Sequence, residues 1–312
     1  MKTKAMLVAA SFLAMQGALA VKPGEVSTTA ESTCAWRAIA AQHPDPKLRN
    51  PDDIAHKLCR SKMQISRDYA SARQQMDSMG ERYAAYFYVN ARTHYIDAAL
   101  KRAAAGGATQ VVNLGAGFDT RAYRFRASLP QVRFFEVDLP ATIEAKKSRV
   151  ADALGGLPDY VRYAPIDFNT QKLEDVLVAQ GYDPKQKTFF ILEGVVMYVV
   201  LPGVSATFDF IRKHSASGSS VVYDYVLQPI IENRFAGYYG AAGTTVAVAS
   251  IGEPYITGWM PPQAAAFLKQ HGMVLVEDVG EKELTERHLT GSDGKPDGRM
   301  IDWHRLIEAR VP

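Results

Sequence analysis

Two glycines and one aspartate are spaced as in a nucleoside-binding site. Gly115 and Gly117 follow an apolar run that is typical of a buried strand, and a second apolar run ends at Asp138. Glycine lets the backbone approach a ligand closely, and an acid at the end of the next strand can accept hydrogen bonds from both ribose hydroxyls. This spacing predicts a site for an adenosine-containing ligand at one edge of an α/β sheet.

The residues after this turn distinguish between such ligands. The dinucleotide version of the motif has a third glycine, which packs the helix and seats a pyrophosphate, whereas this chain has Thr120 at that position. Asp119 would also place a negative charge at the helix N-terminus, where a pyrophosphate would bind. Both residues disfavour NAD and FAD. They favour S-adenosylmethionine, which carries a positive sulfonium, a positive amino group and no phosphate.

The next strand end supplies a further acid and an aromatic ring. Asp167 could accept a hydrogen bond from the adenine amino group while Phe168 packs on the ring. The alternative for Asp167 is an Asx turn, and the alternative for Asp138 is a helix N-cap before Pro140. Because both acids fall at corresponding strand ends, we expect them to bind the ligand.

Two charged residues outside the glycine turn are also candidates. Glu193 closes an apolar strand, and burying an unpaired carboxylate is costly, so a cationic ligand would supply its partner. Arg92 lies on a predicted helix. It is either a surface salt-bridge residue or, because its guanidinium is a fork-shaped donor, the partner of a ligand carboxylate.

The order of apolar patterns predicts an all-helical region followed by alternating strands and helices. Residues 35–105 have helical spacing only, and Gly106-Gly107 marks a helix end. The βαβ order that follows predicts a mainly parallel sheet with helices on both faces. We expect strands at 110–114, 133–137, 161–165, 188–193, 219–225, 273–279 and 302–311, and helices at 120–128, 141–153, 173–179, 202–215 and 261–270.

Two segments of the second half have special roles. No helical pattern separates the last two expected strands, so we expect a long antiparallel hairpin there. Residues 229–254 form an insertion rich in tyrosine and small residues. Insertions at the carboxyl ends of strands commonly wall a substrate pocket.

The composition is that of a globular protein. Of the 312 residues, 47% are hydrophobic and 22% are charged, and the net charge is only +3, which predicts no nucleic-acid partner. No apolar run is long enough for a stable membrane span. The two cysteines, Cys34 and Cys59, form no metal motif, and they are either a disulfide of an exported protein or two buried thiols.

The N-terminus resembles a secretory signal. Lys2 and Lys4 precede an apolar stretch that ends with small residues at Ala18 and Ala20. This three-part pattern predicts a signal peptide at 1–20 and a periplasmic or secreted destination, with a cytoplasmic location as the alternative. We then expect a flexible linker at 21–34, a helical cap at 35–105 and a ligand-binding domain at 106–312.

Together these motifs resemble the leucine carboxyl methyltransferase family and its bacterial relatives, the S-adenosylmethionine-dependent O-methyltransferases. No single block is specific, but they occur in family order. The export-like N-terminus departs from the pattern, because family members usually work in the cytosol, where the cofactor is made. The matching blocks are 91–97, 111–124, 135–140, Asp167 and 192–198.

The resemblance implies a fold and a set of residue roles. The fold is a class I methyltransferase, a Rossmann-like, seven-stranded and mostly parallel α/β sheet with a reversed C-terminal hairpin and an N-terminal helical cap. Position by position, it implies that Arg92 holds the cofactor carboxylate, that Gly115 lies beneath the methionine part and that Glu193 lines the methionine end. It implies that Asp138 binds the ribose and that Asp167 and Phe168 bind the adenine. It also implies that Tyr198 faces the transfer site. The family's N-terminal basic contact has no clean match in this chain.

The acceptor is less constrained by the sequence. A carboxylate is ionised near neutral pH and needs no general base, whereas a phenol or alcohol does. No His-Asp pair at a strand end stands out, which favours a carboxylate of a small molecule or of a peptide C-terminus. The alternatives are an NAD(P)-dependent oxidoreductase and a secreted binding protein that has lost catalysis.

Overall fold

The computed structural model describes residues 24–60, 68–167 and 170–312, and it contains a seven-stranded sheet in the order β3-β2-β1-β4-β5-β7-β6. The first five strands of this order pair in parallel, while β7 is antiparallel to both β5 and β6. The predicted fold class is therefore confirmed. The strands are β1 (Gln110–Leu114), β2 (Arg133–Asp138), β3 (Val161–Pro165), β4 (Thr188–Leu192), β5 (Ser220–Val226), β6 (Val274–Val279) and β7 (His304–Arg310).

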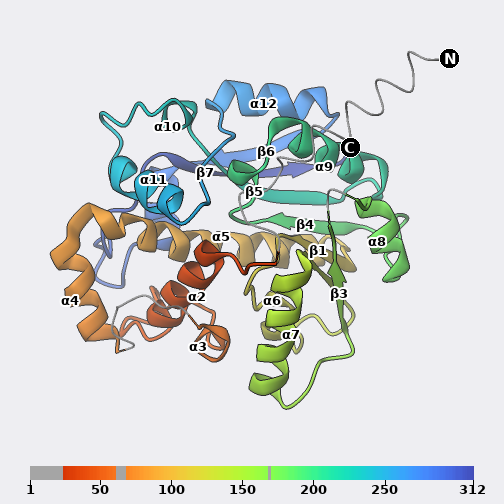
Figure 1. Ribbon diagram of the computed structural model, residues 1–312, viewed down its shortest axis with the longest axis horizontal. Coiled ribbons are helices and arrows are strands. Elements are labelled where there is room, and N and C mark those ends of the chain that lie inside the picture. Colours follow the sequence, from red (N-terminus) through yellow and green to blue (C-terminus); the bar gives the residue numbers. More distant parts are fainter. Residues whose placement is uncertain (1–23, 61–67, 168–169) are drawn as a thin grey trace.

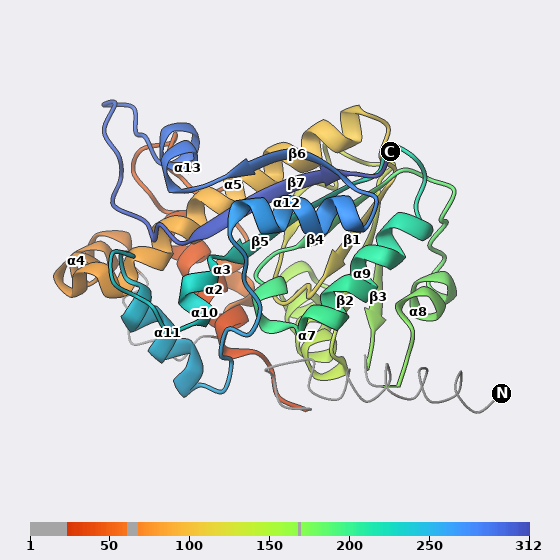
Figure 2. The ribbon, with the colours of Figure 1, turned by 90° about the horizontal axis from the view of Figure 1, so that it is seen from above.

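Helices cover both faces of the sheet. Figure 1 shows α9 (Leu201–Lys213) and α12 (Pro261–Gln270) on one side, with α5 (Ala84–Ala105) and α7 (Pro140–Leu154) on the other. Seen from above, α9 and α12 lie in front of the strands, and α5 lies behind them (Figure 2). The remaining helices are α2 (Thr28–Ala40), α3 (Ala55–Leu58), α4 (Tyr69–Met79), η1 (Gly80–Tyr83), α6 (Arg121–Arg124), α8 (Leu173–Ala179), η2 (Val196–Tyr198), α10 (Gln228–Ile231), α11 (Ala241–Ser250) and α13 (Glu281–His288).

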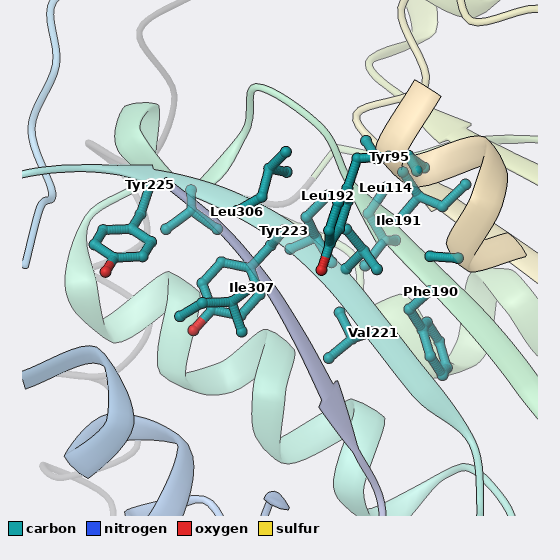
Figure 3. Close-up of a cluster of buried hydrophobic side chains, with 14 of the residues drawn as sticks. Tyr95, Leu114, Phe190, Ile191, Leu192, Val221, Tyr223, Tyr225, Leu306 and Ile307 are labelled. Carbon is teal, nitrogen blue, oxygen red and sulfur yellow. The ribbon is translucent and has the colours of Figure 1, made fainter. Parts of the chain in front are cut away.

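The central strands are apolar because both of their faces are covered. Every residue of β1, β4 and β5 is buried, as expected for parallel strands between two helical layers. Figure 3 shows side chains from several elements meeting in this core, among them Tyr95 of α5, Phe190 of β4, Tyr223 of β5 and Ile307 of β7. Because β1 pairs with β2 on one side and β4 on the other, a crevice opens beyond its carboxyl end.

The last two strands pair antiparallel, as expected, but a helix that was not expected lies between them. Residues 281–288 form α13, and only Leu284 of this polar helix is buried, so no apolar period was visible. Two further expectations about the elements are wrong. The helix expected over 120–128 is the single turn α6. Helix α2 begins at Thr28, inside the segment 21–34 that was expected to be a flexible linker, because Ser27 caps it and Cys34 is buried.

The predicted signal segment, residues 1–20, lies outside the described residues, and the export prediction stays a prediction. Within the described ranges, none of the helices combines the length and the hydropathy needed to span a bilayer.

Candidate functional site

One large cavity of about 1340 Å³ lies at the carboxyl edge of the sheet. Its wall is assembled from α2, α5, the turn after β1, the ends of β2 and β4, helix α11 and the start of β7. The insertion 229–254 supplies part of the wall, as expected. Five of the predicted site residues line this cavity: Arg92, Gly115, Asp138, Glu193 and Tyr198.

Of the two predicted adenine-binding residues, only Asp167 is described by the structure. Asp167 is not among the described lining residues, and its carboxylate accepts a hydrogen bond from the Thr170 hydroxyl at 3.2 Å. Its backbone carbonyl accepts hydrogen bonds from the next turn as well. The N–H of residue 169, which an Asx turn at Asp167 would use, lies outside the described residues. Phe168 lies outside the described residues, so the adenine contact of both residues stays a prediction.

The glycine turn and Asp138 hold each other in place. Gly115 has a φ of +73°, and any side chain there would collide with Val195. The backbone N–H of Gly117 donates to one oxygen of Asp138 at 2.7 Å, and the N–H of Leu139 donates to the other at 2.7 Å. The helix N-cap is Leu139. Desolvation raises the pKa of Asp138, although hydrogen bonds from Gly117, Leu139 and the Thr142 side chain oppose this. The carboxylate still has acceptor capacity for a ligand hydroxyl.

Glu193 lies between two arginines that come from different helices. Its Oε1 is 2.9 Å from Nε of Arg92, and its Oε2 accepts from Nη1 of Arg121 at 2.6 Å. The expectation that a ligand would supply the partner of Glu193 is therefore wrong, because α5 and α6 already bring two cations to it. Burial alone would raise the pKa of Glu193, but Arg121 and Arg92 hold it below its ordinary value. The carboxylate is charged at neutral pH.

This pair belongs to a larger buried network beneath the cavity. Arg92 also donates to Asp224 at 2.6 Å, and Arg121 donates to Asp97 at 2.7 Å. Arginines likewise keep the pKa values of Asp97 and Asp224 below their ordinary range, against the effect of burial. The connected members are four arginines and five carboxylates: Arg37, Arg92, Arg121, Arg124, Asp52, Asp97, Asp119, Glu193 and Asp224.

Helix α2 covers the glycine turn. A Cβ added to Gly117 would lie 3.3 Å from Cβ of Ala30. The N-terminus of α2 is held by the buried carboxylate of Glu253, which follows α11 and accepts a hydrogen bond from the N–H of Thr28 at 2.8 Å. A disulfide joins Cys34 of α2 to Cys59, with their Cα atoms 5.7 Å apart. Sequence patterns could not have predicted the contact with Glu253, because 225 residues separate it from Thr28.

A second part of the cavity wall is aromatic, and it adjoins Arg92 through Asp224. The rings of Tyr198 and Tyr255 are 5.3 Å apart, and the ring of Tyr255 is 5.9 Å from that of His304. The His304 ring lies 4.7 Å from that of Tyr88 at a tilt of 51°, and the Tyr88 hydroxyl donates to Asp224 at 3.2 Å. All of these residues except Asp224 line the cavity. The sequence analysis found Tyr198 and Arg92 but missed the others.

A sequence signal existed for one of the missed residues. Asp224 interrupts an apolar strand, as Glu193 does at the end of its own strand, and the same argument about buried carboxylates selects it. His304 offered no such signal, because its proximity to Asp224 depends on the antiparallel register that pairs Val226 with His304. Across residues 24–60, 68–167 and 170–312, no group of three His, Cys, Asp or Glu side chains could hold a metal ion.

Comparison with known proteins gives consistent matches. The model of the family described as leucine carboxyl methyltransferase matches residues 30–212. The Streptomyces coelicolor protein named "Putative S-adenosyl-L-methionine-dependent methyltransferase SCO7813" is 30% identical over 245 residues, which cover 77% of this chain and 83% of that protein. A Bacillus subtilis protein named "Putative S-adenosyl-L-methionine-dependent methyltransferase YktD" is 30% identical over 196 residues, which cover 63% of this chain and 64% of that protein.

A solved structure agrees on the fold. The crystal structure of a DUF574 family protein from Streptomyces avermitilis matches with a TM-score of 0.54 at 17% identity. The match covers 86% of this chain and 98% of that chain. At this level of identity the likeness concerns the fold alone.

Proposed function

This chain belongs to the leucine carboxyl methyltransferase family, and on that basis we propose that it is an O-methyltransferase for a carboxylate or hydroxyl of a small molecule or a peptide C-terminus. The family match and the names of the relatives confirm the predicted enzyme class and the predicted cofactor, S-adenosyl-L-methionine. Transfer to oxygen, in preference to another atom, is the proposed part.

The charge of the buried network supports a cationic cofactor. Five carboxylates face four arginines, so the network has one negative charge in excess. S-adenosyl-L-methionine carries two positive groups and one carboxylate at neutral pH, a net charge of about +1. A dinucleotide carries negative phosphates, which this network would repel. The residues of the cavity therefore fit the cofactor that the family uses.

Each residue at this end has a role that its geometry supports. Gly115 lines the cavity in a left-handed conformation, and a Cβ there would collide with Val195, so this turn requires glycine. Asp138, fixed by two backbone N–H groups, presents its remaining lone pairs to ribose hydroxyls. Arg92 lies where it would hold the cofactor carboxylate, with Glu193 and Asp224 fixing its guanidinium. Helix α2 covers this end and excludes water.

When bound, the cofactor supplies an activated methyl group on a sulfonium, so the protein mainly has to align the acceptor. Positioning of this kind can lower a barrier by roughly 7–11 kcal/mol. The acceptor end offers tyrosine rings and the apolar side chains of Val246 in α11 and Ile251, which follows α11. These surfaces suit a molecule with an apolar or aromatic body, oriented so that one oxygen faces the methyl group.

The observation that carries this proposal is that one cavity joins the glycine turn, Asp138 and the network with its excess carboxylate. Calorimetric titration of Asp138→Ala with S-adenosyl-L-methionine tests it. Removing a charged hydrogen-bond acceptor costs about 1.5–3 kcal/mol, so we expect binding to weaken roughly ten- to hundredfold. Asp152→Ala, an exposed aspartate on α7, is the control and should bind like the parent.

Three outcomes contradict the proposal in different ways. Equal affinity of the parent and Asp138→Ala would remove Asp138 from the site. Saturable NAD(P) binding by a parent that gives no heat with S-adenosyl-L-methionine would overturn the choice of cofactor. If the cofactor binds normally but methyl groups are found only on nitrogen or sulfur of the products, the O-methyl assignment fails.

A further inference from the structure

A histidine and an aspartate that the cofactor site does not use in full lie together at the acceptor end. His304, the first residue of β7, is only 5% exposed, and its Nδ1 lies 3.9 Å from Oδ2 of Asp224. Neither ring nitrogen makes a hydrogen bond of normal geometry to any residue that the structure describes. Nδ1 is the ring nitrogen nearer to that carboxylate, and Nε2 is buried as well. The side chain lines the cavity.

A buried imidazole without a partner calls for an explanation, since buried polar groups are nearly always hydrogen-bonded. Asp224 is itself held firmly by Arg92 at 2.6 Å and by the N–H of Gly194 at 2.6 Å. It is therefore a fixed anion that can orient the ring of His304 with Nδ1 protonated. In that tautomer Nε2 has a free lone pair, the form needed to accept a proton.

The surroundings of His304 define what could reach it. Its ring contacts Tyr88 at 4.7 Å and Tyr255 at 5.9 Å, and Tyr255 leads on to Tyr198 at 5.3 Å. A flat aromatic body would pack between such rings in offset or edge-to-face contacts. An aliphatic alcohol holds its proton too tightly for a histidine, whereas a phenol has a pKa near 10 and gives up its proton far more readily.

We propose that His304 is the general base of this enzyme and that the acceptor is an aromatic hydroxyl, which rests on the proposed function and narrows its acceptor class. The proton of the phenol passes to Nε2 of His304. The phenol oxygen forms a bond to the methyl carbon as the carbon–sulfur bond breaks, and the bonding pair stays on sulfur as a neutral thioether. The imidazolium formed is stabilised by Asp224 and returns its proton to solvent.

The charged groups around His304 give this base a defined pH range. Asp224 of β5 faces it as an anion, Arg92 of α5 lies beyond that carboxylate, and Tyr88 of α5 and Tyr255 contact the ring. Burial lowers the pKa of His304 below its ordinary value even though Asp224 opposes this. A base must be neutral to act, so methylation of a phenol should rise with pH below about 6.5 and level off near neutral pH.

The first test compares the parent with His304→Gln on two acceptor types. For phenols of ordinary acidity we expect kcat to fall about 10²–10³-fold, within the usual range for a lost general base. For carboxylates, which need no base, the change should be within about threefold. In the variant the rate on phenols should keep rising with pH toward the acceptor's own pKa, with no plateau near neutral pH. His288→Gln, a half-buried histidine outside the cavity, is the matched control.

The second test needs no cofactor. Para-nitrophenol absorbs at a longer wavelength when ionised, so binding to the cofactor-free parent next to a base should shift its spectrum toward the phenolate. His304→Gln should bind it without that shift. Thermal melting and cofactor titration of the variant check that the fold and the cofactor site are intact.

Each outcome separates this inference from the proposed function. Equal phenol turnover and equal pH profiles of the parent and His304→Gln overturn the role of His304. A parent that binds S-adenosyl-L-methionine and methylates carboxylates but no phenols overturns the aromatic acceptor and leaves O-methyl transfer standing. A parent that does not bind the cofactor overturns both.

Discussion

The two ends of the cavity hold their side chains in place by different means. At the cofactor end, Arg92, Glu193 and Arg121 form ion pairs within 2.9 Å, and their side chains are at most 10% exposed. At the acceptor end, tyrosine rings meet at van der Waals distance, and helix α11 contributes Val246, which is 66% exposed. The cofactor end is therefore fixed by the buried charged network, hereafter the charged lattice. The acceptor end is a largely apolar wall that faces the open cavity.

This difference separates what a substitution should change. A residue of the charged lattice holds several others, so altering it changes both the stability of the fold and the affinity for the cofactor. A residue of the apolar wall contacts mostly the cavity, so altering it should change the acceptor without changing stability.

The substitution with the largest expected effect on stability is Glu193→Gln. The neutral amide has the same shape but leaves Arg92 and Arg121 undercompensated in a buried site. Breaking a buried ion pair costs about 3–5 kcal/mol, and we expect a loss of that size in the free energy of unfolding, measured with urea. Cofactor affinity, measured by calorimetry, should fall as well.

Glu286→Gln, an exposed residue of α13, is the control and should stay within about 0.5 kcal/mol of the parent. The parent also has a predicted pH signature. Because the pKa of Glu193 is lower in the folded state than in the unfolded state, its contribution is complete well above pH 4.3 and is lost as the pH falls through the folded-state pKa. A change below 1 kcal/mol for Glu193→Gln would show that the lattice does not support the fold.

The cofactor end could be predicted from the sequence because its parts follow one another along the chain. Gly115, Asp138 and Glu193 end the strands β1, β2 and β4, which are neighbours in the sheet. Parallel strands bring their carboxyl ends to a single edge, so strand order alone places these residues together. What the sequence missed was the pairing of Glu193 with arginines, since Arg92 arrives from a helix whose packing no local pattern encodes.

The acceptor end could not be predicted in the same way. His304 meets Asp224 only through an antiparallel register across 80 residues of chain, and a shift of one residue would turn its side chain to the other face. The absence of an obvious His-Asp pair in the sequence favoured a carboxylate acceptor. The pairing of β5 with β7 brings His304 close to Asp224, so the structure contains a His-Asp pair and that reason for a carboxylate acceptor no longer holds.

The second prediction concerns the cover over the cofactor end. The Cys34–Cys59 disulfide ties α2 to the segment after α3, and α2 lies over Gly117. Closing a loop of this length stabilises a protein by about 2–4 kcal/mol, so reduction with dithiothreitol should lower the free energy of unfolding by that amount. We also expect the cofactor to dissociate faster from the reduced protein, as measured by stopped-flow fluorescence.

The double variant Cys34→Ala, Cys59→Ala provides the control, because reductant should have no effect on it. The relative rates on different acceptors should not change on reduction, since the disulfide lies at the cofactor end. If reduction altered acceptor preference but neither stability nor cofactor dissociation, the two ends would not be independent. Disulfides persist in oxidising compartments, so this bond would be complete in an exported protein.

The smallest effect is expected for a substitution in the apolar wall at the acceptor end. Val246→Ser removes apolar surface from the wall at a position that is 66% exposed, and valine and serine have similar helix propensities. The free energy of unfolding should therefore stay within about 0.5 kcal/mol of the parent. The lost contact with an apolar acceptor is worth about 1 kcal/mol, which raises its KM roughly fivefold, while cofactor affinity is unchanged.

Val178→Ser on α8, 52% exposed and outside the described cavity wall, should change neither quantity. A Val246→Ser protein that lost cofactor affinity along with acceptor affinity would mean that α11 positions the cofactor, and the two ends of the cavity would then act as one.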